Sequence, residues 1–179
     1  VELHFGSMAP GGYAWMFPKS TGANIGLGIQ KRFAKGKSLN IYASDFIDKY
    51  DGDATFNGAG SLPMSGTIKK FVKGNYVLVG DSAGMVLPSN GAGITIAMIG
   101  GRIAGQVIAQ HIKNGCELVE YEKIWKLQMG KVMRNSKRAF KLGSILFKLP
   151  NWSLNLFFNR LTKGIIWRAV TCKRMFWII

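Results

Sequence analysis

The sequence is poor in the residues that build metal centres and disulfide scaffolds. It has two cysteines, Cys116 and Cys172, and two histidines, His4 and His111. So few cysteines in 179 residues exclude a disulfide-rich scaffold and a cysteine-rich metal site. Neither histidine has a metal-ligating partner at a useful spacing. We therefore predict no bound metal and structural roles for both cysteines.

A convincing transmembrane helix is also lacking. The longest uncharged run, Ser82–Gly101, has twenty residues, but five of them are glycine and one is Pro88. Because its backbone would break inside a bilayer, this run predicts a loop that leads into a buried helix. The chain begins at Val1 with no signal peptide, which predicts a start inside a longer protein.

Acidic residues are absent from the last third of the chain. Residues 1–122 hold 11 Lys+Arg and 9 Asp+Glu, a net charge of +2, whereas residues 123–179 hold 13 Lys+Arg and no acid, a net of +13. Such a field attracts the phosphates of nucleic acid or of anionic lipid. Trp, Phe, Leu and Ile lie among these bases and favour a membrane surface, since no basic-aromatic nucleic-acid motif is present. A solvated basic face is the plain alternative.

The first part of the chain predicts an antiparallel hairpin followed by a helix. Residues 13–17 alternate in the manner of a strand, and Pro18 is expected to end it. Residues 24–29 are expected to return as the second strand, where Gly26 and Gly28 indicate a bulky neighbour close to the backbone. Apolar residues at helical spacing then predict an amphipathic helix over 39–50, with Ser38 as its cap. The first strand carries a row of aromatic residues: Tyr13, Trp15 and Phe17.

A second pattern combines a strand, an acidic loop and a helix. The apolar run 76–79 predicts a strand buried on both faces, as in a parallel sheet. Asp81 follows at its carboxyl end, and Gly93 opens a helix that runs to about Lys113. A carboxylate accepts bonds from hydroxyl groups, and the free N–H groups of a helix start suit an anionic oxygen. These parts predict a site for a ligand with a polyol, a phosphate and a flat ring.

A hydrolase is the rival interpretation of the same loop. Gly80–Gly84 matches the G-x-S-x-G elbow that presents a nucleophilic serine. However, a loop containing Pro88 intervenes before the helix, and the only histidine after Ser82 is His111, which precedes the remaining acids. Both features depart from the hydrolase order of serine, acid and histidine.

Two motifs resemble those of a known family. The segment YVLVGDSAGMVLPSNGAGITIAMIGGRIAG is similar to the second flavin motif of p-hydroxybenzoate-hydroxylase-type flavoproteins. PGGYAWMFPK resembles the aromatic motif of geranylgeranyl reductases, among which the archaeal lipid reductases are most similar. Together they cover about residues 9–113. The resemblance implies a reductase that uses FAD to saturate C=C bonds of polyprenyl lipids.

The resemblance also implies roles for particular residues. Asp81 would bond the ribityl chain of FAD, and the backbone at the helix start would meet the isoalloxazine. The implied cofactor-binding residues are Gly80, Asp81, Pro88, Gly91, Gly93 and Ile94. An aromatic wall suits a polyprenyl chain, which offers only apolar surface. The implied substrate-binding residues are Tyr13, Trp15, Phe17 and Pro18, for which simple core packing is the alternative. Neither the catalytic proton donor nor the electron donor is identified.

One departure from the family shapes the prediction. The G-x-G-x-x-G unit that holds the ADP half of FAD is not found in this sequence. We therefore expect an α/β (mixed α+β) fold class, the C-terminal part of such an FAD-binding fold, which needs its N-terminal FAD-binding half as a partner. The expected segments are 1–67 (substrate sheet with one helix), 68–113 (flavin-domain element) and 114–179 (basic helical tail).

The basic tail predicts a peripheral location at the cytoplasmic face of the cell membrane, on an anionic membrane surface and without nucleic acid. Two alternatives remain. The first is a non-catalytic membrane-surface module or truncated gene product. The second is a related FAD-dependent monooxygenase or halogenase, against which the motif at Tyr13–Pro18 argues.

Overall fold

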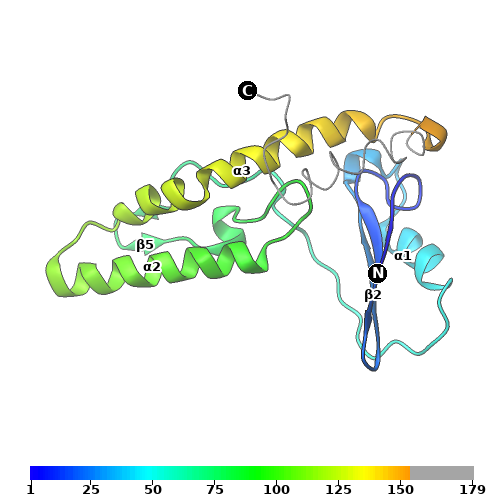
Figure 1. Cartoon of the computed structure of the whole chain (residues 1–179), viewed down its shortest axis with the longest axis horizontal. Helices are drawn as coiled ribbons and strands as arrows, with labels where there is room; N and C mark the ends of the chain where they lie inside the picture. The colour runs from blue at the N-terminus through cyan, green and yellow to red at the C-terminus, as the bar shows by residue number, and fades with distance from the viewer. Residues whose placement is uncertain (154–179) are drawn as a thin grey trace. The chain divides into compact units, whose positions relative to one another are not determined.

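The computed structural model describes residues 1–153, so the predictions that concern residues 154–179 of the basic tail lie outside the described residues. The chain divides into two compact units (Figure 1). The first holds Val1–Gly58 and the described residues from Ser144 on, and the second holds Ala59–Gly143. This division differs from the three predicted segments, because 59–67 and 114–143 group with the flavin-motif region.

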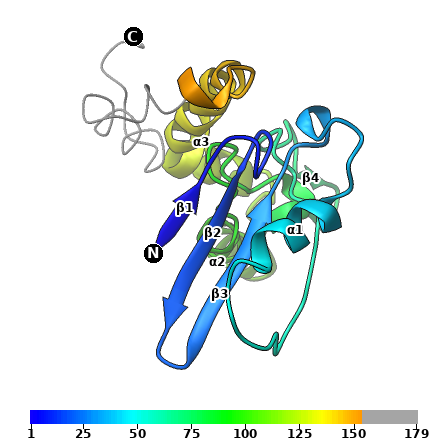
Figure 2. The same ribbon diagram turned by 90° about the vertical axis from the view of Figure 1, so that its right-hand side faces the viewer.

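The first unit is built on a three-stranded antiparallel sheet. Its strands are β1 (Glu2–His4), β2 (Tyr13–Lys19) and β3 (Gly22–Gly28), in the order β1-β2-β3. Figure 2 shows the three strands side by side. The pair Lys19 and Gly22 closes the β2–β3 hairpin around a two-residue turn, which sets the register of the whole ladder. The predicted hairpin is confirmed.

Proline does not end the first hairpin strand, as we had expected. Pro18 lies inside β2 and pairs with Ala23 of β3. The β1 strand pairs only with Ala14–Met16, so β2 has an open edge at Pro18. A proline on an open edge removes no ladder hydrogen bond, which explains why the strand continues.

One face of the sheet is covered by helix α1 (Leu39–Ile47). Ala14, Ile25 and Leu27 lie on this face and pack with Phe46 of α1. Phe46 and Ala14 are fully buried. Ser38 is the residue before the helix, as predicted, although its side chain makes no capping bond. The opposite face of the sheet carries the aromatic row.

Further segments complete the first unit. A short 3-10 helix, η1 (Lys31–Phe33), follows β3, and the ring of Phe33 lies 6.4 Å from that of Phe147. The Asn151 side chain accepts a bond from the backbone N–H of Ser7 at 3.2 Å. Residues separated by more than a hundred positions therefore share this unit.

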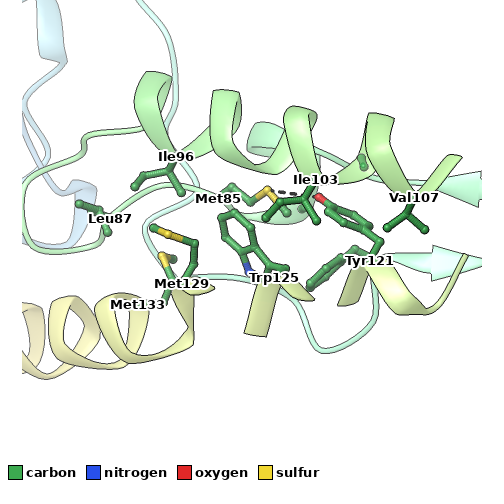
Figure 3. Packing of buried hydrophobic residues seen from close by; sticks show 12 residues of the cluster. Met85, Leu87, Ile96, Ile103, Val107, Tyr121, Trp125, Met129 and Met133 are labelled. Carbon is green, nitrogen blue, oxygen red and sulfur yellow. Dashed lines mark hydrogen bonds between the residues drawn. The ribbon is translucent and has the colours of Figure 1, made fainter. Parts of the chain in front are cut away.

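The second unit packs two long helices around an apolar core. These are α2 (Ile94–Asn114) and α3 (Glu120–Leu146), whose last residues belong to the first unit. In Figure 3, Trp125, Tyr121 and the methionines of α3 point toward α2. Burial raises the pKa of Tyr121 to about 12, and its hydroxyl donates to Met85 Sδ at 3.7 Å. The core is made of buried residues from both helices and the segment before them: Phe71, Ala83, Met85, Leu87, Ile96, Ile103, Ala104, Val107, Tyr121, Trp125, Met129 and Met133.

A small hairpin joins the core through a buried carboxylate. Strands β4 (Val72–Lys73) and β5 (Tyr76–Val77) pair antiparallel. Glu122 is 5% exposed and accepts the backbone N–H groups of Phe71 at 2.8 Å and Val72 at 3.0 Å. Its other oxygen pairs with Lys126 at 3.3 Å. The carboxylate at the start of α3 thus holds the hairpin in place.

The expectation of a parallel strand at 76–79 is wrong for the described residues. This segment contributes only two residues to an antiparallel pair, and Tyr76 is 79% exposed. Val77 and Val79 pack on the core, whereas Leu78 does not. A continuous apolar run suggested burial on both faces, but only its alternate members face inward.

Candidate functional site

The acidic loop after β5 is a tight 3-10 turn. It forms η2 (Gly80–Ala83), and Gly84 ends it with a φ of 66°. A Cβ on Gly84 would lie 2.5 Å from the backbone oxygen of Gly66, so glycine is required there on two counts. Gly80 also has a φ of 66°. These conformations turn the chain sharply just beyond the strand and leave Asp81 exposed.

The carboxylate of Asp81 lies beside the start of α2. A Cβ built on Gly93 would meet Asp81 Oδ1 at 3.7 Å and Val86 Cγ2 at 3.2 Å. The absence of a side chain at Gly93 therefore leaves the backbone accessible next to an exposed carboxylate. The structure brings together Asp81 and Gly93, the two residues on which the predicted site depends.

The loop between them is internally bonded and largely buried. Residues 83–88 are all buried, with Pro88 fully enclosed. The N–H of Leu87 donates to the Ala92 oxygen at 2.9 Å, and the N–H of Gly91 donates to the Leu87 oxygen at 2.8 Å. Gly91 has a φ of 75°, which favours glycine. Pro88 and Gly91 thus shape the loop, and burial and backbone hydrogen bonds hold it between Asp81 and α2.

The first turn of α2 offers unpaired backbone donors. Gly93 precedes the helix without a side-chain cap, and the first intrahelical bond runs from the Ala97 N–H to the Gly93 oxygen at 2.8 Å. The N–H groups of the first turn carry the positive end of the helix dipole. The side chain of Ile94 is 82% exposed. An exposed carboxylate and a helix N-terminus side by side can hold a ligand that carries both hydroxyl and anionic groups.

The same geometry disfavours the hydrolase alternative. The Ser82 hydroxyl donates to the Val79 backbone oxygen at 2.8 Å and so caps its own turn. Ser82 lies within the 3-10 turn η2 and a buried loop follows it, whereas a nucleophile elbow leads directly into an α-helix. His111 lies at the far end of α2 and contacts the Cys116 oxygen at 2.6 Å.

The second group of predicted residues forms a continuous aromatic row on β2. The rings of Tyr13 and Trp15 are 5.7 Å apart, and those of Trp15 and Phe17 are 6.1 Å apart and stacked. Burial raises the pKa of Tyr13 above its ordinary value, so its phenol stays neutral. Trp15 is half-buried, and Phe17 and Pro18 are exposed. The aromatic row is therefore not enclosed in the core of the described residues. Simple core packing was the alternative interpretation of these residues.

Two residues of β3, Asn24 and Gly26, hold the Trp15 side chain of this row in place. The sequence pattern predicted a role for Gly26 but none for Asn24. The Trp15 Nε1–H donates to Asn24 Oδ1 at 2.7 Å. A Cβ on Gly26 would lie 2.6 Å from Trp15 Cζ2, so the Trp15 indole is the bulky neighbour predicted at Gly26. The same prediction is wrong for Gly28, because a Cβ there would meet nothing within 4 Å. Asn24 was missed because its role depends on the strand register. The two-residue turn after Lys19 was the signal from which that register could have been worked out.

The described residues thus hold two candidate sites, one in each unit. The flavin-motif residues Gly80–Ile94 come together in the second unit, and the aromatic row lies in the first. Among residues 1–153, no helix is long and apolar enough to cross a bilayer.

Comparison with known proteins gives consistent matches. Residues 1–59 match the geranylgeranyl reductase catalytic domain. The digeranylgeranylglycerophospholipid reductase of Methanococcus aeolicus is 36% identical over 166 residues, which cover 87% of this chain and 41% of that protein. Digeranylgeranylglycerophospholipid reductase 3 of Methanosphaera stadtmanae is 34% identical over 179 residues, which cover 96% of this chain and 44% of that protein.

A solved structure shares the fold. The crystal structure of a geranylgeranyl bacteriochlorophyll reductase-like protein from Thermoplasma acidophilum matches with a TM-score of 0.74 at 25% identity. The match covers 94% of this chain and 46% of that one. The chain therefore has a mixed α/β fold of the reductase type and spans less than half the length of these relatives.

The fold and the matches assign the chain to the class of geranylgeranyl reductase-like proteins, of which it spans a part. More particularly, the chain belongs to the geranylgeranyl reductase family and is similar to its digeranylgeranylglycerophospholipid reductases.

Proposed function

We propose that this chain is part of an FAD-dependent reductase that saturates C=C bonds in the geranylgeranyl chains of membrane lipids. The observation that carries the proposal is the position of the Asp81 carboxylate beside Gly93 at the start of α2, in a member of the geranylgeranyl reductase family. This arrangement fits the part of FAD that joins hydroxyl groups to a flat ring.

Each residue of the flavin-motif site has a task in this proposal. The Asp81 carboxylate accepts hydrogen bonds from ribityl hydroxyls, and Gly93 and Ile94 present backbone to the ring edge. Gly80, Pro88 and Gly91 hold the turn and the loop that position those groups. FAD, when bound, supplies the redox chemistry of alkene reduction.

The aromatic row is proposed to bind the isoprenoid chain. Tyr13, Trp15 and Phe17 offer a contiguous apolar surface on β2, and Gly26 and Gly28 beside them add no side chains. Pro18 extends this surface along the same strand. A polyprenyl chain has no hydrogen-bonding group, so a flat aromatic surface binds it through area alone.

We propose that further polypeptide completes the FAD site. The chain spans 41% of the Methanococcus aeolicus relative, and its sequence has no G-x-G-x-x-G motif for the FAD pyrophosphate. Ile94 and Ile112 on α2 are 82% and 80% exposed, and the exposed Gly101 and Gly105 between them allow a backbone to approach closely. We propose that the N-terminal half of the reductase packs over this exposed apolar face of α2. The face consists of Ile94, Met98, Gly101, Gly105, Ile108 and Ile112.

The location of the protein follows from its proposed substrate. A reductase of membrane lipids must reach chains that lie in a bilayer, so we propose a peripheral position on the cytoplasmic face of the cell membrane. The +13 charge of residues 123–179 supports it.

Reconstitution tests the proposal directly. The chain would be co-expressed with the portion of the Methanococcus aeolicus reductase that it does not match. We expect the complex to retain FAD, seen by its visible absorbance, and to convert an unsaturated geranylgeranyl lipid to a product of higher mass under reducing conditions. A folded complex that neither holds flavin nor reduces the lipid would refute the proposal.

A non-catalytic membrane-surface module is the second candidate. The observation that favours it is the +13 net charge of residues 123–179, which can bind an anionic surface without any flavin. Vesicle binding by the chain, combined with a flavin-free and inactive reconstituted complex, would support the module.

A further inference from the structure

The solvent face of α3 carries a stripe of positive charge. Its basic residues recur at helical spacing and are all exposed. The buried residues Trp125, Met129 and Ser136 occupy the opposite side of the helix. With a rise of 1.5 Å per residue, the stripe is about 27 Å long. We call it the α3 basic stripe, and it consists of Lys123, Lys126, Lys131, Arg134, Lys137, Arg138 and Lys141.

The stripe lacks the acids that normally accompany bases on a solvated helix. Lys123 pairs with Glu120 at 2.5 Å and Lys126 with Glu122, both at the start of α3. No Asp or Glu follows Glu122 in the sequence. Arg134 is therefore followed at i+3 and i+4 by bases only, and such like-charge neighbours destabilise a helix. An anionic partner would remove this repulsion.

An apolar side chain within the stripe indicates what the partner is. Leu127 lies among the bases and is 85% exposed, and Leu142 at the edge is 44% exposed. A base-and-leucine surface suits the boundary between headgroups and acyl chains. Binding of single-stranded nucleic acid uses exposed aromatic rings for stacking, whereas Trp125, the only Trp of α3, is buried.

We propose that the α3 basic stripe docks on a bilayer surface rich in anionic phospholipid, with Leu127 inserted between the headgroups. This inference deepens the proposed function, because a reductase of membrane lipids needs such a contact to reach its substrate. Among residues 1–153, only the stripe aligns five bases without acidic neighbours along one side of a helix: Lys131, Arg134, Lys137, Arg138 and Lys141.

Vesicle flotation of the 179-residue chain tests the proposal. We expect binding to phosphatidylcholine vesicles that contain phosphatidylglycerol, weak binding to phosphatidylcholine alone, and weakening with added salt. A triple variant should bind the anionic vesicles more weakly, because each lost charge lowers the partition coefficient onto the vesicles about fivefold, or about a hundredfold for three charges. Its substitutions are Lys131→Gln, Arg134→Gln and Lys141→Gln.

A matched variant separates the stripe from total charge. Lys69→Gln, Lys70→Gln and Lys73→Gln remove the same charge from exposed positions outside α3, and binding should stay within about twofold. Equal loss in both triple variants would overturn the proposal, as would no loss in the stripe variant. Circular dichroism verifies that each variant is folded.

A third variant distinguishes lipid from nucleic acid. Leu127→Gln should lower binding to anionic vesicles about tenfold, because the leucine no longer enters the apolar layer. Tighter binding to a single-stranded RNA oligonucleotide than to the vesicles, unaffected by Leu127→Gln, would overturn the proposal in favour of nucleic acid. These assays contain no flavin and measure vesicle binding only. A lack of vesicle binding would therefore not count against the proposed reductase activity, and a lack of reductase activity would not count against vesicle binding.

Discussion

Replacing Glu122 by alanine is predicted to weaken the second unit substantially. Glu122 is almost fully buried, and its carboxylate accepts two backbone N–H groups, from Phe71 and Val72. These residues begin the hairpin that leads into the Asp81 turn. Alanine removes the acceptor and leaves both donors without their partner.

The magnitude follows from the burial of these donors. A buried N–H without an acceptor costs about 1–3 kcal/mol. Phe71 is fully enclosed and Val72 is half-buried. We therefore expect Glu122→Ala to lower the free energy of unfolding by about 3 kcal/mol. Glu122→Gln keeps one acceptor oxygen and should cost about 1 kcal/mol.

The pH dependence gives an independent readout. Burial alone would raise the pKa of Glu122, but the N–H groups of Phe71 and Val72 and the Lys126 ammonium outweigh it and lower the pKa below its usual 4.5. A lowered pKa in the folded state stabilises the fold above pH 4.5, and this stability is lost as the pH falls through the lower value. Glu122→Gln should abolish this part of the acid sensitivity.

Urea denaturation followed by circular dichroism measures these effects. Glu120→Ala is the matched control, because Glu120 also lies in the first turn of α3 but its pair with Lys123 is exposed. It should change the free energy of unfolding by no more than about 0.5 kcal/mol. Similar losses for Glu120→Ala and Glu122→Ala would refute the role given to the buried carboxylate.

Two further pairs of variants test close packing around glycine. Gly26→Ala should displace the Trp15 indole and cost about 1–2 kcal/mol with a changed near-ultraviolet spectrum, whereas Gly28→Ala on the same strand, with open space, should cost less than about 0.5 kcal/mol. Gly100→Ala should destabilise α2 by about 1 kcal/mol in urea titrations, because its Cβ would lie 2.6 Å from the buried Met85 Sδ. Gly105→Ala should stabilise α2 by up to about 1 kcal/mol, because its Cβ would meet nothing within 4 Å and alanine favours a helix more than glycine does. Equal effects within either pair would contradict the packing described.

Local patterns predicted the hairpin and the helices well. The alternation at 13–17 and the helical spacing at 39–50 depend on residues close in sequence, and β2, β3 and α1 confirm the elements, although α1 ends at Ile47 rather than at Tyr50. The helix expected from Gly93 is also confirmed as α2. The prediction of Asp81 beside the helix start agrees with the geometry, although the roles of the two residues stay predictions.

Features that depend on distant residues could not be predicted from local pattern. Glu122 accepts from Phe71 about fifty positions earlier, and nothing near either residue signals the contact. The apolar run at 76–79 was misread because its burial is decided by α2 and α3 rather than by its own pattern. Pro18 was misread because whether a strand edge is open depends on the length of β1.

The flavin affinity of the reconstituted complex tests the central claim most directly. FAD would be titrated into the complex formed with wild-type chain, with Asp81→Ala and with Asp53→Ala, an exposed aspartate of the first unit. Loss of a charged acceptor costs about 1.5–3 kcal/mol, so Asp81→Ala should weaken FAD binding by about tenfold to a hundredfold, and Asp53→Ala should leave it unchanged. Equal FAD affinity in all three complexes would contradict the assignment of Asp81 and α2 as a flavin site.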